Sequence, residues 1–191
     1  MRRSPSVASA GSVCHASRVS RFEIVVVPVD GMEELQPVWR SLYDHHLALT
    51  PHLSDRTQPF ERAWQARQRI EAEWQARGED LFVLAAKAQD RYVGYALVRI
   101  RSGTDFAASW DASERLAELV ILAVLPDWRG QGVGSALLDA VEARLRGLAV
   151  EDMVINVVTN DDAMRLYRRR GAEPFVTELI QRVSPGDVRG G

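Results

Sequence analysis

Three glycines stand at alternate positions in the segment Arg129-Gly130-Gln131-Gly132-Val133-Gly134-Ser135, between an apolar run and an amphipathic stretch with helical spacing. Where a strand leads through a glycine-rich turn into a helix, unpaired N–H groups and the positive end of the helix dipole meet at one point. Glycines there remove the Cβ atoms that would hold a phosphate away from the backbone, and Arg129 adds a positive charge. The spacing therefore predicts a site for a phosphate or diphosphate.

Two other phosphate-binding motifs fit this turn less well. A P-loop needs Lys followed by Ser or Thr after its last glycine, whereas Gly134 is followed by Ser135-Ala136. A dinucleotide-binding fold needs G-x-G-x-x-G directly after the strand and an acidic residue at the end of the next strand. Here the spacing is G-x-G-x-G, and the next apolar run ends in Val157-Val158-Thr159. The turn excludes a P-loop and gives little support to a nicotinamide-dependent enzyme.

A second pattern follows about thirty residues later. The apolar run 153–158 leads into Thr159-Asn160-Asp161-Asp162, a cluster of residue types that cap helices, and then into Ala163-Met164-Arg165-Leu166-Tyr167-Arg168-Arg169-Arg170-Gly171-Ala172. Asn160 is the expected N-cap and Gly171 the expected end of the helix. This pattern predicts a buried strand followed by one short helix.

Together the two patterns resemble the two signatures of the GNAT superfamily, the acyl-CoA-dependent N-acetyltransferases. Residues 129–134 occupy the six places of its arginine/glutamine-x-x-glycine-x-glycine signature. Residues 160–172 follow N-x-x-A-x-x-L-Y-x-x-x-G-F, except that Ala172 stands where the family usually has an aromatic residue. The resemblance covers roughly residues 117–175. It implies an α/β, GNAT-like fold: a mixed, mostly antiparallel central sheet of about six or seven strands with four flanking helices, in the order β-α-α-β-β-β-α-β-α-β.

The hydrophobic pattern along the whole chain fits this order of elements. Strands are expected at residues 22–29, 81–88, 92–101, 116–124, 153–158 and 174–183. Helices are expected at residues 31–49, 59–76, 133–148 and 161–170. Gln89-Asp90 is the expected two-residue turn of a hairpin.

Composition limits the class of protein. The chain has 191 residues, of which 46% are hydrophobic and 26% charged, which is typical of one globular domain. Residues 1–21 contain four arginines and no acidic residue, so we expect a disordered tail, with a single N-acetyltransferase domain at residues 22–191. That domain carries a formal charge of −6, which favours a cationic amine and disfavours nucleic acid. Cys14 is the single cysteine, which excludes an internal disulfide and a cysteine-based metal site.

The resemblance implies catalytic roles for two residues. Tyr167 is the expected acid, donating its proton to the CoA thiolate that leaves; the alternative is a tyrosine of the core. Glu118, inside an apolar strand, is the expected base for the amine. The alternatives at that step are an outward-facing Glu118, Glu114, or a chain of water molecules.

The resemblance also implies a binding site for acetyl-CoA. Free backbone N–H groups of the central strand would bind the pantetheine arm and the thioester carbonyl, with Val124 at the developing oxyanion. The expected contacts are Leu122, Ala123, Val124, Arg129, Gly130, Gln131, Gly132, Val133, Gly134, Ser135, Asn160, Ala163 and Tyr167. No metal is expected.

The expected function is acetyl transfer from acetyl-CoA to a primary amine by direct attack in a ternary complex. The alternative is a non-catalytic acyl-CoA-binding sensor or interaction module with the same fold. We expect a cytoplasmic protein whose acceptor is a small-molecule or peptide amine, with no nucleic acid or membrane partner; the sequence is compatible with a homodimer. The polar candidates for the acceptor site are His45, His46 and Asp111, whereas most of the aromatic residues of the first two helices are expected in the core.

Overall fold

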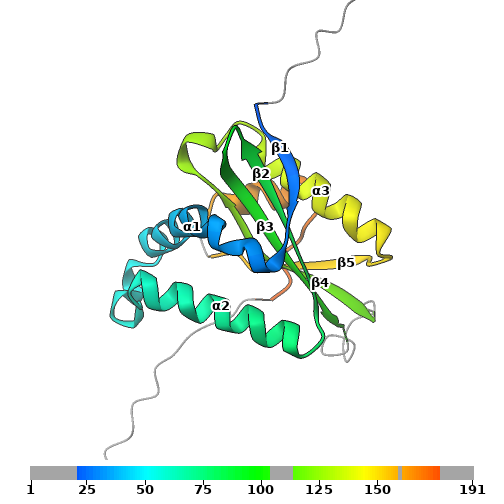
Figure 1. The fold of residues 1–191 in the computed structure, drawn as a ribbon, viewed down its shortest axis with the longest axis horizontal. Helices are drawn as coiled ribbons and strands as arrows, with labels where there is room; N and C mark the ends of the chain where they lie inside the picture. Colours follow the sequence, from blue (N-terminus) through cyan, green and yellow to red (C-terminus); the bar gives the residue numbers. More distant parts are fainter. Residues whose placement is uncertain (1–20, 104–113, 159–160, 177–191) are drawn as a thin grey trace, which may run out of the picture.

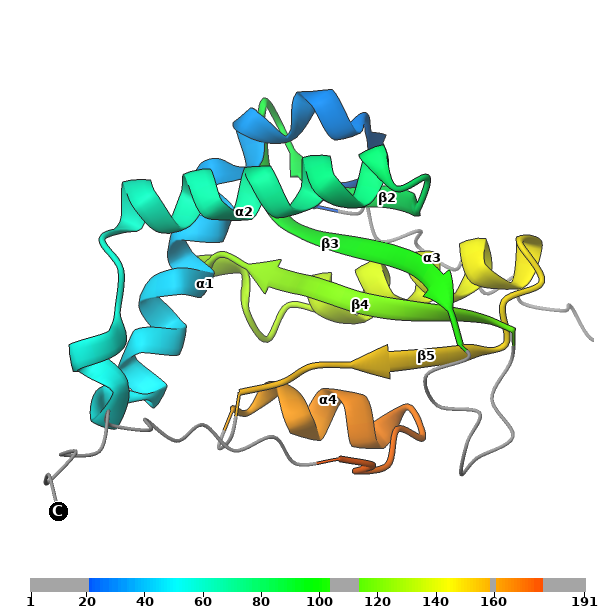
Figure 2. The same cartoon turned by 90° about the horizontal axis from the view of Figure 1, so that it is seen from below.

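The computed structural model describes residues 21–103, 114–158 and 161–176, which form a mixed five-stranded sheet with helices on both faces (Figures 1 and 2). Along the chain the elements are β1 (Glu23–Val27), the 3-10 helix η1 (Val29–Leu35), α1 (Gln36–Leu49), η2 (Pro51–Arg56), α2 (Phe60–Ala76), β2 (Asp80–Ala88), β3 (Arg91–Ser102), β4 (Arg115–Val124), η3 (Pro126–Trp128), α3 (Val133–Gly147), β5 (Asp152–Ile155) and α4 (Ala163–Arg169).

The strands are ordered β1-β2-β3-β4-β5, with antiparallel pairing from β1 to β4 and parallel pairing of β5 with β4. The expected hairpin turn at Gln89-Asp90 is present, because Ala88 pairs with Arg91 and Gln89 has a φ of 54°. The described sheet has five strands rather than the expected six or seven. Of the strand expected at residues 174–183, the described part, 174–176, is not in a strand, and the rest lies outside the described residues.

Each face of the sheet packs against a different set of helices. On one face, α3 contributes the buried side chains Val133, Leu137, Leu138 and Val141, and α4 contributes Tyr167. On the other face, η1 and α1 bury Met32, Leu35 and Val38 against β2, β3 and β4. α2 lies alongside α1 and β2 (Figure 1).

Local chemistry accounts for two element ends that differ from expectation. The α-helix expected from residue 31 begins at Gln36, because Pro37 lies in the first turn, where its missing N–H is not needed; the preceding residues form η1. At α4, Asp161 accepts the N–H of Ala163 on Oδ1 at 2.9 Å, so Asp161 stabilises the start of this helix. The expected N-cap, Asn160, lies outside the described residues.

β4 carries a β-bulge at Val120. Leu97 of β3 pairs with Ile121 and Val98 pairs with Leu119, so Val120 has no partner on β3. On its other side, β4 pairs with β5 only as far as Leu119, opposite Ile155, although β4 continues to Val124. Beyond this point the chain that follows β5 runs away from β4 (Figure 2).

Candidate functional site

The glycine-rich turn between β4 and α3 has the backbone geometry of an anion site. Gly130 and Gly132 have φ values of 70° and 85°, a left-handed conformation that side chains other than glycine rarely adopt. Gly132 is the N-cap of α3, and the helix bonding starts where the N–H of Ala136 donates to the carbonyl of Gly132 at 2.9 Å. The N–H groups of residues 133–135 therefore have no acceptor within the helix and are available to an anion.

Side chains tie this turn to the end of β4. Arg129 donates from Nε to the carbonyl of Val124 at 3.1 Å, and Gln131 donates to the carbonyl of Asp127 at 2.5 Å. Arg21 donates to the side-chain oxygen of Gln131 at 3.0 Å. Arg129 is exposed, so its guanidinium lies at the surface of the turn, beside the last residue of β4.

Gly134 has a different role from the other two glycines of the turn. Its conformation is helical, and a Cβ placed on it would lie 3.4 Å from Cδ2 of Leu166 and 3.9 Å from Cγ2 of Val124. The absence of a side chain lets the first turn of α3 pack closely on α4 and on β4.

The register of β4 shows which of its N–H groups face β5. Leu125 donates its N–H to the carbonyl of Val93 on β3 at 2.9 Å. Because bonding alternates along an antiparallel pair, the N–H of Ala123 is directed to Tyr95 on β3, whereas those of Leu122 and Val124 point away from β3. The expected free N–H at Ala123 does not fit this register. Leu122 and Val124 present theirs on the side where the pairing with β5 has ended.

Tyr167 is buried between α4 and the sheet. Burial, with a further contribution from the Asp161 carboxylate, raises the pKa of Tyr167 to about 12. Its hydroxyl is therefore protonated at neutral pH and acts as a hydrogen-bond donor.

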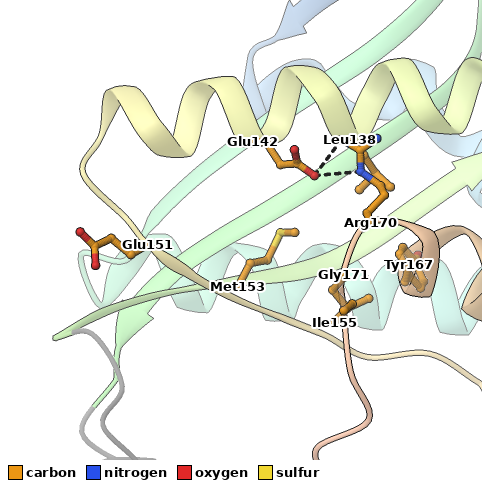
Figure 3. Close-up of a pocket in the computed structure, with 9 residues that line it drawn as sticks. Leu138, Glu142, Glu151, Met153, Ile155, Tyr167, Arg170 and Gly171 are labelled. Carbon is orange, nitrogen blue, oxygen red and sulfur yellow. Dashed lines mark hydrogen bonds and ion pairs between the residues drawn. The ribbon is translucent and has the colours of Figure 1, made fainter.

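A cavity of about 270 Å³ lies between α3, β5 and α4, with Tyr167 in its wall (Figure 3). Arg170 crosses its rim and donates to Asp139 at 2.7 Å and to Glu142 at 2.8 Å; these bonds raise the pKa of Arg170 although its burial acts the other way. The lining residues are Leu138, Glu142, Glu151, Met153, Ile155, Tyr167, Arg170, Gly171 and Ala172. No residue of the glycine-rich turn is among them, so this cavity is separate from the anion site.

Glu118 lies within the paired part of β4, opposite Val154 of β5, and both of its oxygens accept bonds. Asn156 donates to Oε1 at 3.0 Å, while Arg99 and Arg101 reach Oε2 at 3.4 Å and 3.3 Å. The Glu118 side chain is 15% exposed. The expected base is thus held by three donors that the sequence analysis did not identify.

Arg99 links Glu118 to α2. Its guanidinium lies over the ring of Trp74, 4.5 Å from the centroid, and pairs with Glu79 as well as with Glu118. Hydrogen bonds from Arg99 and Arg77 lower the pKa of Glu79, although burial alone would raise it. Arginine at alternate positions of an otherwise apolar strand was the sequence signal for this network.

A buried ion pair under α2 was also missed. Glu71, 3% exposed, accepts from Nε of Arg67 at 2.6 Å. Burial raises the pKa of Glu71, and Arg67 opposes this. Burial, and then Glu71, raise the pKa of the neighbouring Tyr95 on β3 well above its ordinary value. The spacing of four residues within a helix could have indicated this pair.

The acceptor-site candidates separate into two groups. Trp39 stacks with Tyr43, Phe60 and Trp64 at centroid distances of 5.7, 5.4 and 5.2 Å, so these aromatic residues join α1 to α2 as expected for a core. His45 instead lies with Nε2 3.3 Å from Oδ2 of Asp161.

His46 is adjacent to that contact. Burial lowers the pKa of His46, Asp161 raises it and His45 lowers it further, with a net decrease. Asp111 lies outside the described residues. Within the described ranges, no three His, Cys, Asp or Glu side chains gather closely enough to hold a metal ion. No helix in the same ranges combines the length and apolar composition that a membrane crossing requires.

Comparison with known proteins places these features in a family. The chain matches the Acetyltransferase (GNAT) family over residues 39–172. It is 34% identical over 101 residues to a mycothiol acetyltransferase of Propionibacterium freudenreichii subsp. shermanii, a match covering 48% of this chain and 32% of that protein. The chain thus spans about a third of that relative's length.

Two solved structures share the fold at low sequence identity. An acetyl transferase from Pyrococcus furiosus superposes with a TM-score of 0.64 and 18% identity, covering 85% of this chain and 99% of the other. An aminoglycoside N-acetyltransferase in complex with CoA gives a TM-score of 0.56 and 19% identity, covering 85% and 99%. With the family match extending over more than half of its length, the chain belongs to the GNAT family of acetyltransferases.

Proposed function

We propose that this protein transfers an acetyl group from acetyl-CoA to a primary amine on a small polar molecule. The observation that carries the proposal is the glycine-rich turn at the N-terminus of α3, next to the point where the pairing of β4 with β5 ends. A diphosphate at that turn would place the rest of a CoA molecule along the unpaired part of β4.

The donor would be held mainly by backbone groups. The N–H groups of Val133, Gly134 and Ser135 would donate to the diphosphate, with Arg129 beside it. The N–H groups of Leu122 and Val124 would bind the pantetheine arm and the thioester carbonyl, and Val124 would stabilise the oxyanion. We retain Gly130, Gln131, Gly132, Asn160 and Ala163 as expected contacts, and Ala123 without a role for its N–H.

In the reaction, the amine nitrogen would attack the thioester carbonyl carbon, a C–N bond would form and the C–S bond would break, leaving the electron pair on sulfur. Tyr167 would donate to that sulfur. A phenol with a pKa of about 12 facing a thiol with a reference pKa of about 8.5 makes complete transfer of the proton uphill by roughly 5 kcal/mol. Tyr167 would therefore act first as a hydrogen-bond donor to the thiolate, with the proton following from the amine or solvent.

The role of Glu118 is proposed to be one of positioning. Its carboxylate accepts from Arg99, Arg101 and Asn156, which leaves little room for a further proton donor. Asn156 is the first residue after β5, so Glu118 would fix the point at which the two strands separate.

The names of the relatives guide the choice of acceptors. One is a mycothiol acetyltransferase and another an aminoglycoside N-acetyltransferase, so the test set should contain small polar amines. Isothermal titration would measure binding of acetyl-CoA, and mass spectrometry would detect acetylation of sisomicin, glucosamine, glycinamide and a peptide with N-terminal alanine. We expect micromolar binding and acetylation of at least one small amine. Binding without acetylation of any of the four would favour the non-catalytic sensor, and absence of binding would reject both functions.

A further inference from the structure

The contact between His45 and Asp161 joins two segments that lie more than a hundred residues apart in the sequence. Asp161 uses both carboxylate oxygens: Oδ1 accepts the N–H of Ala163 at 2.9 Å, and Oδ2 lies 3.3 Å from Nε2 of His45. The Asp161 side chain is 10% exposed, whereas that of His45 is 28% exposed. A fixed, nearly buried carboxylate thus orients an imidazole that solvent and small molecules still reach.

This pair joins α1 to the start of α4, the helix that carries Tyr167. Asp161 accepts the N–H of Ala163, the first residue of α4, and after burial its charge contributes to the raised pKa of Tyr167. From the other side, α1 packs against β4 (Figure 2). His45 therefore lies beside the segment after β5, because its partner Asp161 donates its N–H to the carbonyl of Val158 at 3.1 Å.

We propose that His45, oriented by Asp161, takes the proton from the ammonium group of the acceptor so that the neutral amine can attack. This inference rests on the acetyl transfer proposed above. A carboxylate facing Nε2 favours the tautomer with its hydrogen on that atom and leaves Nδ1 as the proton acceptor. One proton passes from the ammonium to Nδ1 and then to solvent. The second leaves the nitrogen as the amide forms and ends on the CoA sulfur, to which Tyr167 donates a hydrogen bond.

The neighbouring charged groups support the choice of His45. Burial lowers the pKa of His46, the other histidine of the pair, which makes it the weaker base. Glu118 is engaged by three donors in the paired part of the sheet. The charged and titratable groups identified around His45 are Asp161 from the loop before α4 and His46 on its own helix. Imidazole is the side chain most often used for proton transfer near neutral pH.

The decisive experiment compares two amines that differ in protonation. Glycinamide is largely an ammonium ion at pH 7, whereas hydroxylamine is mostly neutral. With acetyl-CoA saturating, we expect His45→Gln and Asp161→Asn to lower kcat/KM for glycinamide by roughly 10²-fold and for hydroxylamine by less than about tenfold. Asn at position 161 can still accept the N–H of Ala163. His52→Gln, an exposed histidine on η2, is the matched control and should behave as wild type.

Several outcomes would overturn the proposal. An equal loss with both amines would assign His45 a structural role, and no loss with either would exclude it as the base. The ring-nitrogen NMR signals of ¹⁵N-histidine protein give an independent test: we expect His45 to carry its hydrogen on Nε2, and to lose that preference in Asp161→Asn. A different tautomer in wild type would also contradict the proposal. If wild type binds acetyl-CoA but acetylates neither amine, nor any amine of the panel above, the failure belongs to the proposed function.

Discussion

A Cβ atom on Gly134 would lie 3.4 Å from Cδ2 of Leu166, so the first turn of α3 packs directly on the helix that carries Tyr167. Gly134→Ala should be tolerated, because the added methyl makes an ordinary contact and alanine gains about 1 kcal/mol of helix propensity. Gly134→Val should cost about 1 to 3 kcal/mol in the free energy of unfolding, because its methyl groups meet Leu166. Urea unfolding of both variants checks this, and equal stability of the two would contradict the packing.

Gly132 allows the anion site to be tested separately from strain. Gly132 and Gly78 both have left-handed backbone conformations, with φ values of 85° and 75°, and a Cβ on either would meet nothing within 4 Å. Valine at either position should therefore cost similar stability, about 1 to 2 kcal/mol. Only Gly132→Val should weaken CoA binding, by about tenfold or more, measured by isothermal titration. If both variants bound CoA with the same affinity, the assignment of the diphosphate to this turn would be wrong.

Replacing Tyr167 with phenylalanine tests the acid. The ring stays in the core while the donor is lost, so turnover should fall by roughly 10²-fold and acetyl-CoA affinity should change by less than about twofold. Tyr92→Phe, on the half-buried tyrosine of β3, is the matched control. Full turnover of Tyr167→Phe would mean that the thiolate leaves without this donor.

The pH profile of Glu118→Gln distinguishes positioning from proton transfer. If Glu118 holds Arg99, Arg101 and Asn156 in place, activity should fall at every pH between about 6 and 9. If Glu118 were the base, the loss would ease as rising pH supplies neutral amine. Profiles of kcat/KM against pH for wild type and Glu118→Gln distinguish the two roles. Recovery of the variant's activity at high pH would also weaken the case for His45 as the base.

His46 predicts a pH dependence of stability. Burial lowers its pKa below the ordinary value of 6.5, so between the two values the unfolded chain binds more protons than the folded one. This group's contribution to stability is therefore present above pH 6.5 and is lost as the pH falls through the folded pKa. His46→Gln should reduce the loss of unfolding free energy between pH 7.5 and 5, measured with urea. If His46→Gln lost as much unfolding free energy between pH 7.5 and 5 as wild type, His46 would not be the group responsible.

The parts of the fold that follow from local sequence were predictable. Gly171 was expected to end a helix, and it follows the C-cap of α4 in a left-handed conformation with a φ of 90°. Tyr167 on α4 and the turn before α3 followed from motif spacing in the same way. These features depend on a few consecutive residues.

The contacts of the candidate site were less predictable, because they join distant segments. Glu118 was identified, but its partner Asn156 depends on the pairing of β4 with β5. His45 was identified as polar, but its contact with Asp161 depends on how α1 crosses the sheet. A single sequence gives the residue types of such pairs without their register.

Because of the bulge at Val120, odd-numbered residues of β4 face one side of the sheet before it and the other side after it. Before it, Ala117 and Leu119 face the core beneath α3; after it, Ile121 and Ala123 face the core beneath α1. Deleting Val120 would remove the bulge and leave the residues that follow opposite their present partners, because Leu119 opposite Val98 would be followed directly by Ile121 opposite Leu97. Apolar side chains would keep their faces, but the strand would lose the local bend and the added twist that a bulge produces. The extra residue thus sets the course of β4 at the point where its pairing with β5 ends.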